Sequence, residues 1–115
     1  MSIVRLTPLS LLVLLLALAV IPAIADEKKK DVGEVTFVCK TTGNDNDGYN
    51  LIATNNGTTD KECKASCTLT KKGGGKTSGD EKTKLVRAGK TENVYGEAGI
   101  SGAPLSDPQI DASCR

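Results

Sequence analysis

The sequence contains no histidine and no tryptophan, and its aromatic residues are one phenylalanine and two tyrosines. Without histidine the chain lacks the commonest general base and a frequent metal ligand. No serine lies in a nucleophile-elbow motif. Two carboxylate pairs, Asp45 with Asp47 and Asp80 with Glu81, lie in polar stretches that are typical of solvated surface. We therefore predict that the protein is not an enzyme and that it uses no cofactor.

Long hydrophobic runs are absent after residue 25, and the one long run, residues 9–21, belongs to a targeting segment. Arg5 gives this segment a positive start, and Ala23 and Ala25 are small residues at the two positions that signal peptidase recognises. We predict a signal peptide over residues 1–25 and secretion to the periplasm or the extracellular space. A membrane anchor is the alternative, but a spanning helix needs about 20 apolar residues. No anchor is expected after cleavage.

Excess charge is also lacking in the chain that follows this segment. Residues 1–25 contain one of the 15 basic residues, Arg5, and none of the 14 acidic residues, so the formal net charge of residues 26–115 is zero. A balanced chain does not favour nucleic acid or an anionic membrane as a partner.

Large apolar side chains are few in residues 26–115, where Val, Ile, Leu, Phe and Tyr together number 15. Small secreted domains with thin cores are commonly held together by disulfides. The chain has four cysteines, Cys39, Cys63, Cys67 and Cys114. We predict that all four form structural disulfides and that none binds a metal.

The segment 62–70 alternates small or apolar residues with polar ones, which predicts a half-buried central strand. Four residues of strand span about 13 Å, whereas the Cα atoms of a disulfide lie within about 7 Å of each other. Cys63 and Cys67 therefore cannot pair with each other in a strand. Cys39 and Cys114 must each pair with one of them, and the sequence leaves the choice open. The alternative is a helix, because residues 59–62 have a capping-box pattern.

Further alternating segments predict strands at residues 34–41, 49–55, 81–87, 91–97 and 109–114. Phe37 is expected in the core. The charged segment 26–33 is predicted to be flexible, and residues 34–115 to form one domain. The predicted fold is all-β, a small disulfide-stapled antiparallel β-sandwich.

Three polar motifs have alternative interpretations. Residues 42–48 are rich in Asn, Asp and Gly, but they lack the EF-hand ligand pattern and are better explained as a turn. The sequence Asn55-Asn56-Gly57 predicts a hairpin turn, and Asn56 also begins a glycosylation sequon whose use stays open. Gly75-Lys76-Thr77 resembles the end of a phosphate-binding loop without the rest of that motif, so we expect a flexible connection there.

Residues 49–57, a strand followed by Asn-Gly, resemble bacterial extracellular immunoglobulin-like modules. Residues 85–91 resemble the later strand–Ala-Gly–strand turn of the same modules, so the resemblance covers roughly residues 49–94. It implies an immunoglobulin-like sandwich and assigns no functional residue. The chain departs from antibody-type domains because it lacks their buried tryptophan.

The sequence therefore predicts a noncatalytic secreted binding module that contacts a protein or glycan through loops or a sheet face. The alternative is a secreted inhibitor or effector that presents residues 99–108 as a loop, with Leu105 as the contact residue. The oligomeric state is not predicted.

Overall fold

The computed structural model describes residues 25–115, which form seven strands and, in that range, no helix. The strands are β1 (Glu27–Val32), β2 (Val35–Thr42), β3 (Gly48–Asn55), β4 (Lys61–Thr70), β5 (Lys82–Val86), β6 (Thr91–Glu97) and β7 (Ser106–Cys114). The predicted signal peptide lies outside the described residues, apart from Ala25. The described part of the chain includes no helix with the length and hydropathy to cross a membrane.

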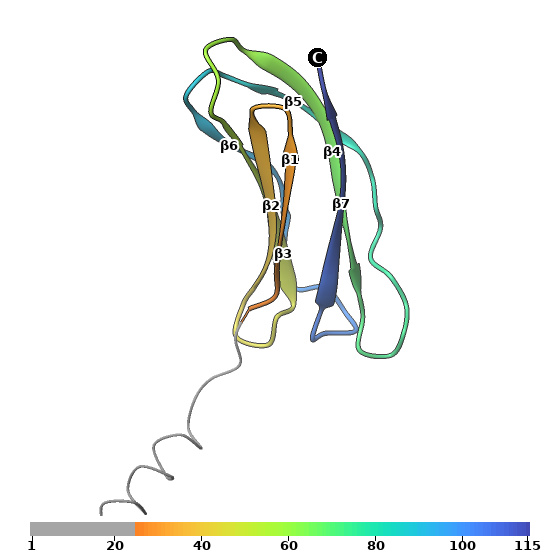
Figure 1. The fold of residues 1–115 in the computed structure, drawn as a ribbon. Coiled ribbons are helices and arrows are strands. Elements are labelled where there is room, and N and C mark those ends of the chain that lie inside the picture. The colour runs from red at the N-terminus through yellow and green to blue at the C-terminus, as the bar shows by residue number, and fades with distance from the viewer. Residues whose placement is uncertain (1–24) are drawn as a thin grey trace, which may run out of the picture.

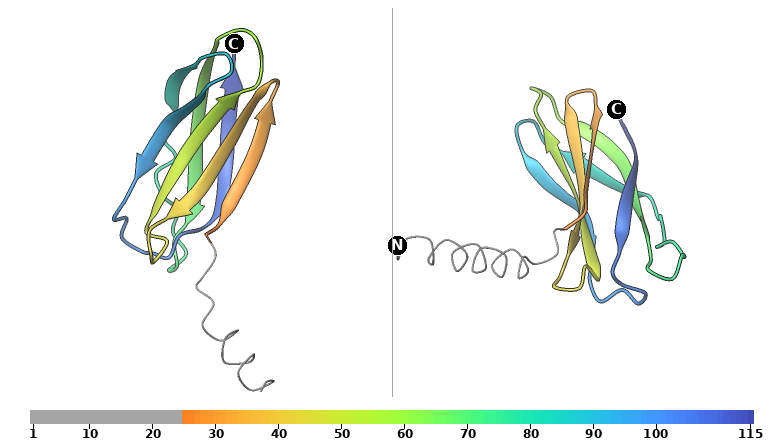
Figure 2. Two further views of the ribbon diagram at one scale, coloured as in Figure 1. Left: turned by 90° about the vertical axis from the view of Figure 1, so that its left-hand side faces the viewer. Right: turned by 60° about the horizontal axis from the view of Figure 1, so that its bottom comes forward.

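The strands form two antiparallel sheets that pack face to face (Figures 1 and 2). The four-stranded sheet has the order β1-β2-β3-β6, and the three-stranded sheet has the order β5-β4-β7. This confirms the predicted β-sandwich, with β4 as the central strand of its sheet. The strand order differs from that of immunoglobulin constant domains, whose second and third strands lie in different sheets, whereas β2 and β3 here are hydrogen-bonded neighbours.

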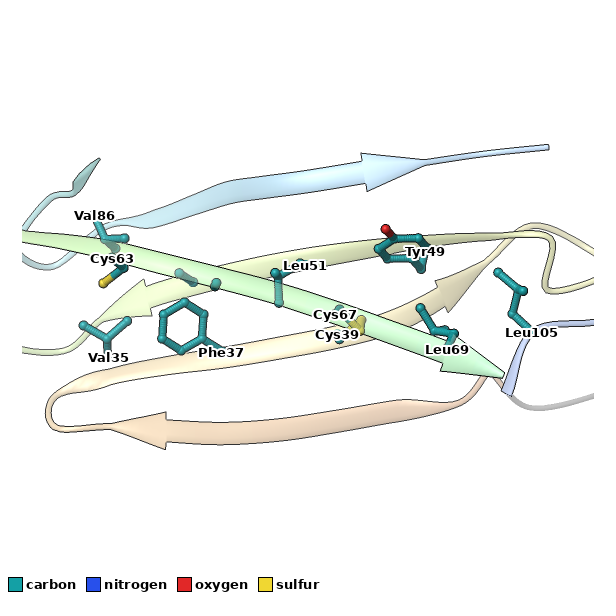
Figure 3. Packing of buried hydrophobic residues seen from close by; sticks show 12 residues of the cluster. Val35, Phe37, Cys39, Tyr49, Leu51, Cys63, Cys67, Leu69, Val86 and Leu105 are labelled. Carbon is teal, nitrogen blue, oxygen red and sulfur yellow. A yellow bond between two sulfur atoms is a disulfide. The ribbon is translucent and has the colours of Figure 1, made fainter. Parts of the chain in front are cut away.

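The core lies between the two sheets and consists of the inward-facing side chains of β2, β3 and β4, with Val86 and Leu105 closing its two ends (Figure 3). Cys63, Ala65, Cys67 and Leu69 are all buried and alternate along β4 with more exposed polar residues. Phe37 is fully buried, as predicted. The period-two burial confirms β4 as a strand and excludes the helix alternative.

Both disulfides start from β4, and the structure resolves the open pairing. Cys39 bonds Cys67 and so joins the two sheets, with Cα atoms 6.4 Å apart. Cys63 bonds Cys114 on the neighbouring strand β7, with Cα atoms 4.0 Å apart. Two disulfides are typical of proteins that fold in an oxidising compartment outside the cytoplasm.

The prediction that residues 26–33 are flexible is wrong, because β1 occupies most of this segment. β1 pairs antiparallel with β2 over its whole length. The Thr36 hydroxyl also donates a hydrogen bond of 2.8 Å to the Asp31 carboxylate. An edge strand has one free side and keeps charged side chains in water, and lysines there discourage pairing with other chains. The charge run therefore indicates solvent exposure and not the absence of a strand.

The predicted Asn-Gly hairpin is also wrong, since the turn after β3 carries the chain to the other sheet. The buried Asn55 holds this crossing: its side-chain amide donates to the carbonyl oxygens of Thr59 (2.8 Å) and Val86 (2.9 Å). Its Oδ1 accepts from the Gly57 amide at 2.9 Å. One side chain thus joins the ends of β3 and β5 and the loop before β4.

The connection at residues 71–81, predicted to be flexible, is partly ordered by Thr77, which is buried. The Thr77 amide donates to the Leu69 carbonyl at 2.9 Å, and the Leu69 amide donates to the Thr77 hydroxyl at 3.0 Å. Thr77, the last residue of the segment that resembles a phosphate-binding loop, therefore uses its hydroxyl to accept a hydrogen bond from β4.

Candidate functional site

Three loops gather at one end of the sandwich, at the bottom of Figure 1: those after β2, β4 and β6. Two of them enclose a hollow of about 560 Å³. Its lining combines polar and apolar residues: Asn44, Asp45, Asn46, Asp47, Gly99, Ile100, Gly102, Ala103 and Pro104. We call this the loop-end hollow.

Two backbone hydrogen bonds hold the walls of the hollow together. The Ile100 amide donates to the Asp47 carbonyl, and the Leu105 amide donates to the Asn46 carbonyl, both at 2.8 Å. Asn46 adopts a left-handed conformation with φ of 51°, which asparagine tolerates better than most residues. The hollow is therefore formed by loops whose backbones are fixed to each other.

Leu105 anchors the wall of the hollow that residues 99–104 form. Its side chain is 1% exposed and lies next to Leu69 at one end of the core (Figure 3). The loop after β4 is joined to the same wall, because the Lys72 amide donates to the Gly102 carbonyl at 2.9 Å. All three loops at this end are thus connected by backbone hydrogen bonds.

The hollow offers two kinds of contact. Ile100, Ala103 and Pro104 supply apolar surface, and Asp45 with Asp47 supply carboxylates beside asparagine amides. Pockets that combine apolar surface with a few polar groups are typical of ligand sites. Within residues 25–115, no group of three or more His, Cys, Asp or Glu side chains is placed to hold a metal ion.

A tyrosine pair lies where β3 and β6 meet. The ring centres of Tyr49 and Tyr95 are 5.9 Å apart, and Lys82 Nζ lies 4.9 Å from the centre of the Tyr95 ring. Burial, with the negative charges around it, raises the pKa of Tyr49. The Glu97 carboxylate, which accepts a hydrogen bond of 3.4 Å from the Tyr95 hydroxyl, raises the pKa of Tyr95. Both hydroxyls are neutral at physiological pH.

The structure separates the residues that the sequence singled out. Asp45 and Asp47 line the hollow, whereas Asp80 and Glu81 are exposed just before β5 and are not part of its lining. The prediction of Leu105 as a contact residue is wrong, because its side chain is buried in the core. Asn56 is exposed on the loop between β3 and β4.

Sequence reasoning missed Ile100, Ala103 and Pro104 as partners of the acidic turn. The two walls lie more than fifty residues apart in the chain. Only the topology, which brings the ends of β2 and β6 together beside β3, juxtaposes them. No local pattern could have shown it.

Comparison of the chain with protein-family models, with curated proteins and with solved structures gives no significant match.

Proposed function

We propose that this protein is a noncatalytic secreted binding module that contacts a protein or glycan through the loop-end hollow. The observation that carries the proposal is the hollow itself, whose walls are fixed by the hydrogen bonds from Ile100 to Asp47 and from Leu105 to Asn46. Loops held by a rigid scaffold commonly carry binding sites. A preformed site also loses less conformational entropy when its ligand binds.

The disulfides and the predicted signal peptide support secretion, to the periplasm or the extracellular space. Cys39–Cys67 links the two sheets and Cys63–Cys114 links β4 to β7. Such bonds keep a small domain folded outside the cell, where its binding loops would meet their partner.

Immobilised glycan and peptide arrays test this function with three proteins. The first is the wild type. The second carries Ala103→Arg, which fills the hollow with a long side chain. The third carries Thr59→Arg, a matched change at an exposed position outside the hollow. We expect ligands that the wild type and Thr59→Arg retain and that Ala103→Arg loses. Equal binding by all three proteins would show that the hollow is not the site.

The alternative function, a secreted inhibitor or effector, would use the same loop. With Leu105 buried, its contact surface would have to include exposed residues of the loop such as Ser101 and Pro104. It predicts that a Pro104 variant loses inhibition of a target enzyme while the protein keeps its stability.

A further inference from the structure

A second depression, of about 420 Å³, lies on the outer face of the four-stranded sheet. It is lined by Thr42, Asn50, Asn93, Val94, Tyr95, Gly96, Glu97 and Ala98. We call it the sheet-face groove. It involves the ends of β2 and β6 that lead into the loop-end hollow.

The groove exists because a side chain is missing from the outer face of β6. Gly96 lies opposite Asn50, and a Cβ atom added to Gly96 would come within 2.5 Å of Asn50 Oδ1. The Asn50 amide therefore lies over the glycine and forms part of the floor. Any side chain at position 96 would displace this amide and fill the groove.

The polar groups of the groove suit a ligand rich in hydroxyl groups. Each asparagine amide presents donors and an acceptor in one plane, and the Thr42 hydroxyl both donates and accepts. Within residues 25–115, the side-chain amides of Asn50 and Asn93 make no hydrogen bond to protein atoms, unlike the side-chain amide of Asn55. Both are thus available to a ligand.

The charge of the groove favours a neutral ligand. Glu97 is the one ionisable carboxylate among the groove residues, and it already accepts the Tyr95 hydroxyl hydrogen bond. No lysine or arginine belongs to the lining. Among the lining residues an anionic ligand would therefore find no opposite charge and a cationic ligand only this carboxylate, whereas sugar hydroxyls match the side-chain amides and Thr42.

The groove and the hollow adjoin each other along the chain. Glu97 and Ala98 line the groove, and the next residues, Gly99 and Ile100, line the hollow. On the other wall, Thr42 lines the groove and Asn44, two residues later, lines the hollow. A chain-like ligand could occupy both depressions at once.

We propose that the ligand is a linear, neutral oligosaccharide, with some sugar units in the loop-end hollow and others in the sheet-face groove. This inference rests on the proposed function and adds a ligand class and a second subsite. Affinity then rises with chain length until both depressions are filled. A gain of about tenfold corresponds to one or two further hydrogen bonds to neutral groups.

The test is calorimetric titration with cellulose-, starch- and chitin-derived oligosaccharides, each series running from the disaccharide to the hexasaccharide. The proteins are the wild type, Gly96→Val and Asn93→Ala in the groove, Ala103→Arg in the hollow, and Thr83→Val on the other sheet as a control. Asn93 is exposed, so its variant keeps the test valid if Gly96→Val does not fold. Circular dichroism checks each fold.

For at least one series we expect the wild type and Thr83→Val to bind the hexasaccharide about tenfold more tightly than the disaccharide. The groove variants should lose this length dependence and keep disaccharide binding. Length-independent binding, unchanged groove variants, or no binding of any series would overturn the inference. If array ligands still depend on Ala103 in that case, the proposed function survives; if they do not, both fail.

Discussion

Cys39 and Cys67 join the two sheets at the centre of the core, and both sulfur-bearing side chains are almost completely shielded from solvent. Cys63, four residues before Cys67 on β4, bonds Cys114 within one sheet. The amide and carbonyl groups of Glu62 and Arg115 exchange hydrogen bonds of 2.9 Å beside this second bond. The pair Cys63 and Cys114 is therefore a non-hydrogen-bonded pair of the ladder, where Cα atoms come closest.

Replacing either disulfide with two alanines should lower the free energy of unfolding by about 3–4 kcal/mol, since each closes a loop of the unfolded chain. The sequence separations are 28 and 51 residues. Cys39→Ala with Cys67→Ala should be the more costly change, because it also opens a cavity between the sheets. Guanidinium titrations of both double variants measure this. A smaller loss for the inter-sheet pair would contradict its assigned role.

Asn55→Ala should destabilise the protein by about 2–3 kcal/mol, because it leaves buried backbone groups without partners. The side chain bonds the carbonyl oxygens of Thr59 and Val86 and the amide of Gly57. Asn56→Ala is the matched control at the next residue, which is exposed, and its effect should stay within about 0.5 kcal/mol. Thermal unfolding followed by circular dichroism compares the two, and equal melting temperatures would refute the role of Asn55.

Leu105→Ala should cost about 2–5 kcal/mol, as expected for a buried leucine. Leu85→Ala should cost about 1 kcal/mol or less, because Leu85 is 48% exposed. Urea denaturation measures both. Leu105→Ala should also weaken ligand binding at the loop-end hollow, because the buried Leu105 side chain positions the segment whose backbone amide bonds the Asn46 carbonyl. If Leu105→Ala binds the ligand as tightly as the wild type at temperatures where the variant is folded, then Leu105 does not support the hollow.

Stability should fall as the pH rises above about 10, the ordinary pKa of tyrosine. The pKa values of Tyr49 and Tyr95 are raised in the folded protein, from 10.0. Between the unfolded and folded pKa values the folded state binds more protons, so raising the pH favours unfolding there, and below pH 10 these groups have no effect. Denaturation at pH 8 and pH 11 measures the slope. Tyr49→Phe should reduce it, and an unchanged slope would rule Tyr49 out as the source.

The sequence predicted strands β2 to β6 to within one residue at each end, because their alternation of buried and exposed residues is a local signal. It missed β1, whose lysines mask an edge strand, and the first three residues of β7, which include Pro108, because proline is rare inside strands. Pro108 is tolerated because β7 is an edge strand. The disulfide pairing and the crossing at Asn55 depend on which strands share a sheet. Local alternation does not carry that information, so the sequence could not predict either feature.

For the candidate site, the sequence singled out Asp45 and Asp47 as an acidic turn and residues 99–108 as a presented loop. It could not show that these segments face each other. It also placed Leu105 at the surface, whereas this side chain is buried in the core cluster just before β7 begins. A loop residue that packs into a core has no periodic neighbours to reveal it.

The most direct test of binding at the loop end is amide chemical-shift mapping of the ¹⁵N-labelled wild type. The probe is the tightest glycan or peptide from the arrays, added to saturation. We expect the largest shifts at residues 44–47 and 99–104, with smaller ones at the far end of the sandwich. Largest shifts at residues 56–60 and 87–90, or on the outer face of β4, would contradict it.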